Sequence, residues 1–354
     1  MRPGSHAHLK AVPLTAMVVL GAAVLAGCQQ APAAIFRPES PGATAIHNLS
    51  LYLLAVAGVA LVGVEVTLFL AVARFSNRPE EEAVQTHGNL KLETGWTAAT
   101  AIVVFITLGL TVNTMVDVTA NIAESPPSLA SAMPLQSAWP GDTLPMRVVG
   151  HQWWWTFEYP QQGIVTANEA HVPVGDTVRA QLESGDVIHS FWAPRLGGKT
   201  DMIPGQINYT SFLAATIGSY TGECAEFCGV EHAHMGFTIV VDSPADFSDW
   251  VAGQQAPAAS AGTDAERAGY QTFTRSCGVC HTINGTEARG KSGPNLTHLA
   301  SRQMLAANTL ENNPTNLARW IQDPQGLKPG NLMPNQKLDQ QQISDLVAYL
   351  SILK

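Results

Sequence analysis

The sequence predicts a multidomain protein with a two-helix transmembrane hairpin, an all-β sandwich or barrel, and an all-α carboxyl-terminal domain. Two apolar stretches exceed the ~20 residues that a helix needs to cross a membrane core. Short β-type runs separated by turn residues follow them. Helical segments then surround a Cys-x-x-Cys-His motif. The chain of 354 residues is long enough for two or three such domains.

The composition agrees with membrane segments diluted by soluble domains. Charged residues make up 13% of the chain, against about a quarter in ordinary globular proteins, and hydrophobic residues make up 46%. The net charge of −9 argues against nucleic acid as a partner. Because each of the five cysteines finds a specific chemical use below, no structural disulfide is expected. They are Cys28, Cys224, Cys228, Cys277 and Cys280.

The first 27 residues predict an export signal of the lipoprotein type. Arg2 and Lys10 precede an apolar run, and small residues precede Cys28. Residues 25–28, Leu-Ala-Gly-Cys, resemble a bacterial lipoprotein box, which implies that Cys28 becomes the lipidated first residue. The alternative is an uncleaved anchor with an idle cysteine. In both cases the next residues begin outside the cytoplasm.

Residues 28–118 are expected to contain the hairpin, with spans at about 49–73 and 96–116. Arg74, Arg78 and Lys91 lie in the short connection, so the positive-inside rule places it in the cytoplasm. We therefore expect a multi-pass protein of a bacterial plasma membrane with both following domains on the extracytoplasmic face.

Two acids mark this hairpin. Glu65 lies at membrane depth, where an acid is unfavourable unless it faces protein or water. It indicates either packing against a larger membrane partner or a protonated acid hydrogen-bonded within the hairpin. Glu93 stands at the cytoplasmic start of the second helix, where the macrodipole favours an acid.

Residues 119–252 are predicted to form the β domain. Runs such as 146–149 and 237–241 are β-type and are broken by Gly, Pro and Asp. A helical period becomes visible only at residues 246–251. The β-type runs extend from Met146 to about Asp242, and a module of about 100 residues is the ordinary size of a Greek-key sandwich.

The domain contains a Cys-x3-Cys-x3-His-x2-Met motif made by Cys224, Cys228, His232 and Met235. Soft sulfur donors with imidazole select copper or zinc. Two close thiolates can bridge a pair of metal ions, and a thioether supplies a weak ligand. The alternative is a disulfide between the two cysteines, which is common in exported proteins.

A dinuclear site needs a terminal imidazole for each metal. His189, 35 positions before Cys224, supplies one of them, although a lone His among apolar residues is more often a core histidine. His232 and His234 both qualify for the other, because alternation would put them on one face of a strand. Spacing does not choose between them.

These motifs resemble subunit II of haem–copper cytochrome c oxidases, with its cupredoxin-like domain and dinuclear copper A centre. The resemblance covers residues 45–252 and implies that His232, not His234, is a ligand, beside His189, Cys224, Cys228 and Met235. It also implies that the Glu226 carbonyl binds copper. The Glu226 carboxylate would reach a magnesium ion shared with the catalytic subunit. One departure is His189-Ser190-Phe191, where the family has Trp in the third place.

The same resemblance assigns two further roles. Residues 150–159 match the family's aromatic motif, in which Trp153 is the contact through which electrons enter. Trp154 and Trp155 are interpreted as core residues. Glu93, in Glu-Thr-Gly-Trp, aligns with the acid that guards a proton-channel entrance into the catalytic subunit.

Residues 253–262, rich in Ala, Pro and Gln, predict a flexible linker. Beyond it, Cys277 and Cys280 with His281 form the attachment motif of a c-type haem, with His281 as proximal iron ligand. A thioredoxin-type dithiol is the alternative, but the trailing His and the absence of a βαβ pattern disfavour it.

Residues 263–354 resemble a class I cytochrome c domain. Gly269 and Phe273 on a first helix would cross Leu346 and Tyr349 on a last one. The resemblance makes Met333, in Asn-Leu-Met-Pro, the sixth iron ligand. Met304 is the alternative and is interpreted as a core side chain. Met/His ligation raises the haem potential.

Charge separates the two exported domains. Residues 119–253 hold fourteen acids and four bases, and residues 254–354 hold seven acids and nine bases. We hypothesise that this difference favours docking of the two domains. The alternative is an acidic surface that is simply solvated.

The sequence therefore predicts the electron-input subunit of a caa-type, proton-translocating oxidase, performing electron transfer only. Implied partners are oxidase subunits I and III, and as donor an exported cytochrome or a quinol-cytochrome c reductase complex. Electrons would pass by haem and copper A to subunit I, where dioxygen is reduced to water. The alternative is a membrane-anchored copper-delivery protein, which leaves the haem motif unused. A nitrous-oxide-reductase-like enzyme would need a repeated propeller domain, and the sequence has no such repeat.

Overall fold

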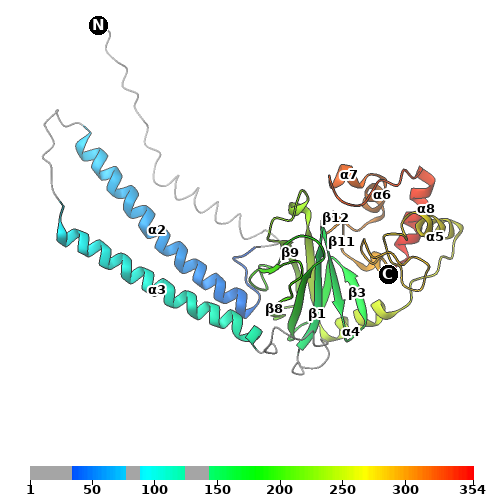
Figure 1. Ribbon diagram of the computed structural model, residues 1–354, viewed down its shortest axis with the longest axis horizontal. Helices are drawn as coiled ribbons and strands as arrows, with labels where there is room; N and C mark the ends of the chain where they lie inside the picture. Colours follow the sequence, from blue (N-terminus) through cyan, green and yellow to red (C-terminus); the bar gives the residue numbers. More distant parts are fainter. Residues whose placement is uncertain (1–33, 77–87, 124–142) are drawn as a thin grey trace, which may run out of the picture.

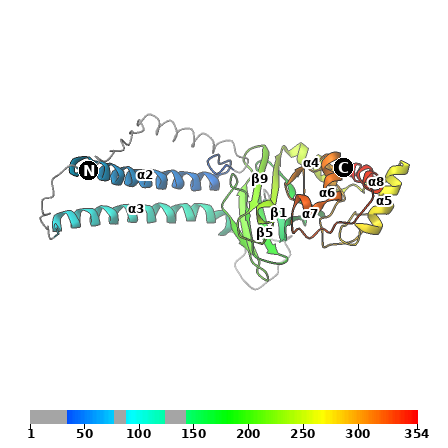
Figure 2. The ribbon, with the colours of Figure 1, turned by 90° about the horizontal axis from the view of Figure 1, so that it is seen from above.

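The computed structural model describes residues 34–76, 88–123 and 143–354. Three parts follow one another along the molecule: a long helical hairpin, a β sandwich and a small helical domain (Figure 1). The view from above shows the same order, with the helical domain on the side of the sandwich away from the hairpin (Figure 2). The predicted fold class is confirmed. The predicted signal, Cys28 and Arg78 lie outside the described residues.

The hairpin consists of α2 (Pro41–Phe75) and α3 (Leu90–Ala123). Both are long and apolar enough to cross a membrane, and their side chains are largely exposed along the middle, as membrane-facing helices are. Both are longer than the apolar stretches. Helix α2 begins at Pro41, before its apolar stretch, because Ser40 caps it by accepting a bond from the Ala43 amide at 3.1 Å. The hydroxyls of Tyr52 and Thr107 lie 3.3 Å apart and join the two helices.

The end of the hairpin at which α2 begins is bonded to the sandwich. Ser40 Oγ donates to the carbonyl of Leu196 at 2.6 Å, and Arg195 pairs with Glu39 at 2.7 Å. At the opposite end, Glu93 Oε1 accepts a bond from the Asn89 amide at 3.1 Å in the first turn of α3. Glu65 is exposed on α2.

The sandwich is built from two five-stranded sheets, ordered β3-β2-β1-β5-β8 and β4-β10-β9-β6-β7. Most neighbours are antiparallel, but β1 with β5 and β4 with β10 are parallel. The bounds are β1 (Thr143–His151), β2 (Trp154–Tyr159), β3 (Ile164–Ala167), β4 (Glu169–Pro173), β5 (Thr177–Ser184), β6 (His189–Trp192), β7 (Thr200–Met202), β8 (Asn208–Leu213), β9 (Gly218–Cys224) and β10 (Gly236–Asp242).

Aromatic residues fill the space between the sheets. Trp155 is fully buried, and its ring meets Phe191 and Phe237 edge-on at 6.0 and 5.1 Å. Phe191 stacks on Phe237 at 4.5 Å, so the smaller ring that departs from the family motif still packs in the core. Trp154 points the other way, as strand alternation requires, and stacks on His151 at 4.3 Å. The interpretation of Trp154 as core was therefore wrong, and Trp155 is core.

Helix α4 (Pro244–Gln255) follows the sandwich and begins at a Ser243 cap. The helical period at residues 246–251 predicted this helix, but it continues to Gln255. The first three residues of the expected linker are thus helical, and residues 256–263 connect α4 to the next helix.

The carboxyl-terminal domain contains α5 (Asp264–Ser276), α6 (Pro314–Gln322), α7 (Pro324–Leu327) and α8 (Gln340–Ser351), with a short hairpin of β11 (Met304–Leu305) and β12 (Leu310–Glu311). Helices α5 and α8 cross as predicted. A Cβ at Gly269 would lie 2.0 Å from the Asp345 carbonyl oxygen, so only glycine permits this approach. Phe273 and Tyr349 meet beside it, with ring centroids 6.1 Å apart.

Candidate metal centre and haem cavity

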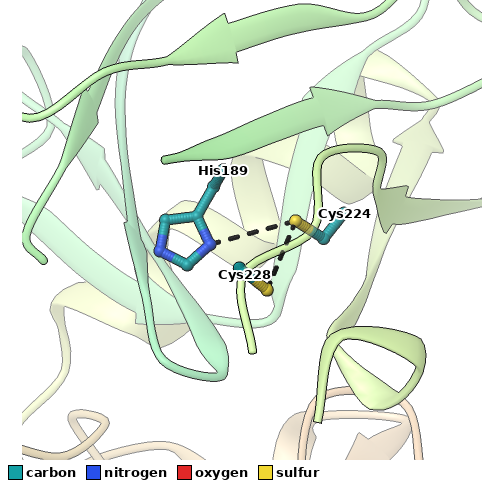
Figure 3. Close-up of side chains that lie close together, drawn as sticks. All are labelled: His189, Cys224 and Cys228. Carbon is teal, nitrogen blue, oxygen red and sulfur yellow. Dashed lines mark hydrogen bonds between the residues drawn. The ribbon is translucent and has the colours of Figure 1, made fainter. Parts of the chain in front are cut away.

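Strand pairing brings the two halves of the metal motif together. Cys224 ends β9, His189 begins β6, and these strands are antiparallel neighbours with Phe191 opposite Cys224. The imidazole of His189 consequently points at both thiols (Figure 3). Its Nδ1 lies 3.9 Å from Cys224 Sγ, and the sulfurs of Cys224 and Cys228 are 3.8 Å apart.

The loop between β9 and β10 adds the remaining candidates. His232 Nδ1 lies 3.6 Å from Cys228 Sγ, and Met235 Sδ lies 3.7 Å from the same sulfur. The Glu226 carbonyl oxygen is 3.2 Å from Cys224 Sγ. All six residues expected at the copper centre therefore lie around the two thiols.

His234 does not join them. Its Nδ1 contacts Glu231 Oε2 at 2.7 Å, and its side chain is 52% exposed. Residues His232–His234 form a 3₁₀ turn, η1, and not a strand, so side chains two apart diverge. The expectation that alternation would place both histidines on one face was wrong for this reason.

The electrostatics of the thiols suit a bound cation. The hydrogen bond between the two sulfurs lowers the pKa of the Cys224 thiol, although burial opposes this. A second thiolate beside the first is unfavourable, so the pKa of Cys228 is raised. Both cysteines are free in the described chain, and 3.8 Å between sulfurs is far beyond a disulfide bond of about 2.05 Å. Only positive charge between the sulfurs would let both ionise, and the donor set fits copper.

The Asp186 carboxylate contacts the ring nitrogen of His189 that faces away from the thiols. The Nε2 of His189 lies 2.7 Å from Asp186 Oδ1, while the Gln152 amide donates to Oδ2 at 2.6 Å. Burial lowers the pKa of His189, but its contacts with Asp186 and Cys224 together outweigh burial, and the net pKa is raised. This bond leaves Nδ1 directed at the thiols, in the way that outer carboxylates orient metal-binding imidazoles.

Trp153 lies directly behind the metal loop. Its side chain is only 7% exposed, and Nε1 donates to the Cys228 carbonyl oxygen at 3.0 Å. Gln152 Nε2 donates to the same oxygen at 2.8 Å. Trp153 is therefore adjacent to the thiols but is covered from solvent by the carboxyl-terminal domain, which supplies the other wall of the cavity described next.

A cavity of about 290 Å³ opens between the two domains. The carboxyl-terminal domain contributes Cys277, Cys280, His281 and Met333, and Met304 as well. The sandwich contributes a wall of Gln152, Trp153, Trp154 and Asn168. Both candidate methionines thus line the cavity, so the assignment of Met333 as the sixth iron ligand stays a prediction.

The cavity fits a covalently held haem. Burial lowers the pKa of His281, so its imidazole is neutral, and Nδ1 donates to the Pro294 carbonyl at 2.8 Å, which leaves Nε2 free for iron. A Cβ at Gly293 would lie 2.7 Å from the His281 ring, so a larger residue there would displace the imidazole. Arg302 lines the same cavity with its Nε buried and without a partner, which suits an anionic group of the ligand.

Three of these residues escaped the sequence analysis. Asp186, three positions before His189, could have been found as a carboxylate beside a candidate ligand. Arg302, and Lys328, a buried lysine that also lines the haem cavity, carry no motif signal, because their places come from tertiary burial. Glu226 lies outside the group of side chains that could share one ion, which among the described residues is His189, Cys224 and Cys228.

Comparisons with known proteins place the chain in a family. Three family models match: the transmembrane domain of cytochrome c oxidase subunit II at residues 32–111, its periplasmic domain at 161–243, and cytochrome c at 266–354. The subunit 2 of Alkalihalophilus pseudofirmus cytochrome c oxidase is 35% identical over 322 residues, 90% of each chain. That of Bacillus subtilis is 30% identical over 362 residues, 98% of each chain. A crystal structure of the periplasmic domain of subunit II from Bradyrhizobium japonicum has 35% identity and a TM-score of 0.32, and covers 33% of this chain and 96% of that one.

An apolar hairpin, a sandwich with paired thiols and a haem-attachment domain define a membrane-anchored electron-transfer subunit with exported domains. The chain belongs to the cytochrome c oxidase subunit 2 family, in the form that carries a fused cytochrome c domain. Copper A and haem are its cofactors, and it works as part of an oxidase complex in the membrane.

Proposed function

We propose that this chain accepts electrons from an exported donor at its haem domain and delivers them to the copper centre and onward to catalytic subunit I. The observation that carries the proposal is the shared wall. Trp153 lines the haem cavity and also donates its indole hydrogen bond to Cys228. A single side chain therefore connects the two redox sites.

The copper pair would be held by the two thiols, by one nitrogen each from His189 and His232, by Met235 and by the Glu226 carbonyl. Haem would be held by Cys277, Cys280 and His281, with Met333 as the distal ligand. Both groups supply one-electron redox chemistry when bound. The protein's part is to keep the sites dry, to orient His189 through Asp186, and to fix the thiol loop through Gln152 and Trp153.

Several finer assignments belong to the same proposal. The Glu226 carboxylate would meet magnesium at the interface with subunit I, and Glu93 would stand at a proton-channel entrance. Subunit III, and an exported cytochrome or a quinol-cytochrome c reductase complex as donor, complete the set of partners. Cys28 would carry the lipid, and the hairpin would cross the plasma membrane twice with both exported domains on the outer side.

Paramagnetic resonance of the oxidised, purified chain tests the proposal. We expect a hyperfine pattern from one unpaired electron shared over two copper nuclei, together with the signal of a low-spin haem. A copper-delivery protein would instead show single-copper hyperfine structure or a silent Cu(I) site. Either of those results would overturn the proposed function.

A further inference from the structure

Lys328 is a buried lysine at the boundary of the two exported domains. It directly follows α7, and its side chain is only 3% exposed. Its ammonium donates three hydrogen bonds: to the carbonyl oxygens of Trp153 at 2.9 Å, His234 at 2.7 Å and Ala306 at 3.2 Å. An ammonium group has three donors, so all of them are used.

Two of these acceptors belong to the copper domain and frame the metal centre. Trp153 lies in the turn between β1 and β2, and His234 lies in η1, between His232 and Met235. The third acceptor, Ala306, belongs to the haem domain. One side chain therefore holds both loops around the thiols against the rim of the haem cavity, of which Lys328 is itself a part.

The Ala306 acceptor is presented by an unusual loop. Ala306, Ala307 and Asn308, at the tip of the β11–β12 hairpin, have φ of 51°, 58° and 63°, which non-glycine residues rarely adopt. In this conformation the Ala306 carbonyl faces Lys328 and the Ala307 carbonyl accepts from the Gly236 amide of β10 at 3.1 Å. The loop is shaped for the contact with the copper domain.

The docked domains together supply the three acceptors that a buried ammonium needs. Lysine is almost never buried without partners. Burial lowers its pKa to about 8, while the nearby Glu231 carboxylate works in the opposite direction, so the group remains largely protonated at neutral pH. Undocking would remove two of its three acceptors and return the charge to water.

The other bonds across the boundary are few. Besides the bond from Gly236 to Ala307, Asn308 Nδ2 donates to Thr238 Oγ1 at 2.9 Å, and the Gln303 amide donates to Glu169 Oε2 at 2.8 Å. Two longer side-chain bonds, from Gln303 Nε2 to Ser219 Oγ at 3.5 Å and from Gln254 Nε2 to Ser301 Oγ at 3.4 Å, complete the set among the described residues. Among the described residues no ion pair links the sandwich to the haem domain. The difference in net charge between the domains is thus not expressed as salt bridges at the boundary.

We propose that Lys328 is the docking latch of this chain, a positioning residue that fixes the haem cavity against Trp153 through the Trp153 and His234 carbonyls. The bonds it makes are short-range and buried, so the docked state depends on this side chain more than on the opposite charges of the domains. The consequence for electron transfer rests on the proposed function, whereas the latch itself does not.

Hydrogen exchange on the full-length, cofactor-loaded chain tests the latch without measuring activity. The Gly236 and Gln303 amides donate across the boundary, so their exchange reports undocking. In Lys328→Met, which keeps length and removes the ammonium, two charge-assisted bonds across the boundary are lost. We expect protection of both amides to fall roughly tenfold to a hundredfold or more. Lys354→Met removes an exposed charge from the same domain and should leave protection unchanged.

Two further readouts separate a latch from a merely structural lysine. The visible haem spectrum and the copper signal should remain in Lys328→Met, while the haem-to-copper rate falls. In the wild type, we expect this rate to be insensitive to salt. In the unmodified protein, an amine-acylating reagent should modify Lys328 at least tenfold more slowly than exposed Lys354, because Lys328 reacts only when the domains separate. The acylation measurement can be made even if the Lys328→Met protein does not accumulate.

Unchanged protection of Gly236 and Gln303 in Lys328→Met, or equal acylation of Lys328 and Lys354, would overturn the latch. A missing two-copper signal would overturn the proposed function while leaving the exchange result interpretable. The two failures are therefore distinguishable.

Discussion

The indole Nε1 of Trp153 donates a hydrogen bond to the carbonyl oxygen of Cys228, at 3.0 Å. This bond joins the wall of the haem cavity to a residue whose thiol lies in the metal centre. Gln152 supplies a second bond to the same oxygen, so the loop between β1 and β2 fixes the loop that carries the thiols. The relationship predicts how Trp153 can be altered without dismantling the site.

Replacing Trp153 with Phe removes one hydrogen bond while Gln152 still satisfies the Cys228 carbonyl. We expect a loss of stability of about 1 kcal/mol and an intact copper signal. The haem-to-copper rate, followed after rapid reduction of the haem, should fall clearly. Trp250→Phe, which alters a ring packed on His171 and Tyr159, is the control. An unchanged rate in Trp153→Phe would show that electrons do not enter the copper domain there.

Asp186→Asn should weaken copper binding, because the carboxylate that orients His189 is replaced by a neutral amide. Loss of such outer partners typically lowers metal affinity by roughly tenfold to a hundredfold. Competition with a chelator measures this, with exposed Asp201→Asn as the control. Equal copper retention by both variants would exclude the orienting role.

The two neighbouring histidines should differ sharply. His232→Ala removes an imidazole 3.6 Å from Cys228 Sγ, so the shared two-copper hyperfine pattern should be lost or replaced. His234→Ala removes a half-exposed ring bonded to Glu231 and should leave the pattern intact. Paramagnetic resonance of both variants decides the assignment, and the reverse outcome would make His234 the ligand.

Stability should depend on pH through His171. Burial lowers its pKa, but hydrogen bonds to Glu169 and Asp242 outweigh burial and the net pKa is raised above 6.5. The protonated form therefore stabilises the fold fully below about pH 6.5, and this contribution is lost as pH rises through the higher folded pKa. Calorimetry of the full chain should show the advantage of wild type over His171→Gln shrinking as pH is raised. A difference independent of pH would contradict this.

Gly269→Ala tests the crossing of α5 and α8. Its Cβ would lie 2.0 Å from the Asp345 carbonyl oxygen, so the helices must separate, at a cost of about 1–3 kcal/mol or more. Gly253→Ala in α4 is the matched control, since nothing lies within 4 Å and alanine favours a helix. Thermal unfolding should show a lower Tm for the first variant and an equal or higher Tm for the second.

Local sequence patterns predicted most of the architecture. Apolar length predicted α2 and α3, and the Cys-x3-Cys-x3-His-x2-Met spacing predicted a centre whose members do lie together. The pattern of short strands could not show that residues 232–234 form a 3₁₀ turn, because alternation is equally compatible with a strand there. Nor could the sequence pattern show that the sandwich forms one wall of the haem cavity. Strand alternation turns Trp154 away from the sandwich core, but no local period shows that the haem domain lies against it or that Lys328 is buried there.

Helix α4 carries the chain rigidly to Gln255, so only residues 256–263 are left to connect it to α5. Eight residues reach at most about 29 Å when fully extended. When the domains separate, the haem domain swings within that radius and returns, with an effective concentration in the millimolar range. Its rebinding is consequently first-order, unaffected by dilution of the protein, and sensitive to any lengthening of the tether.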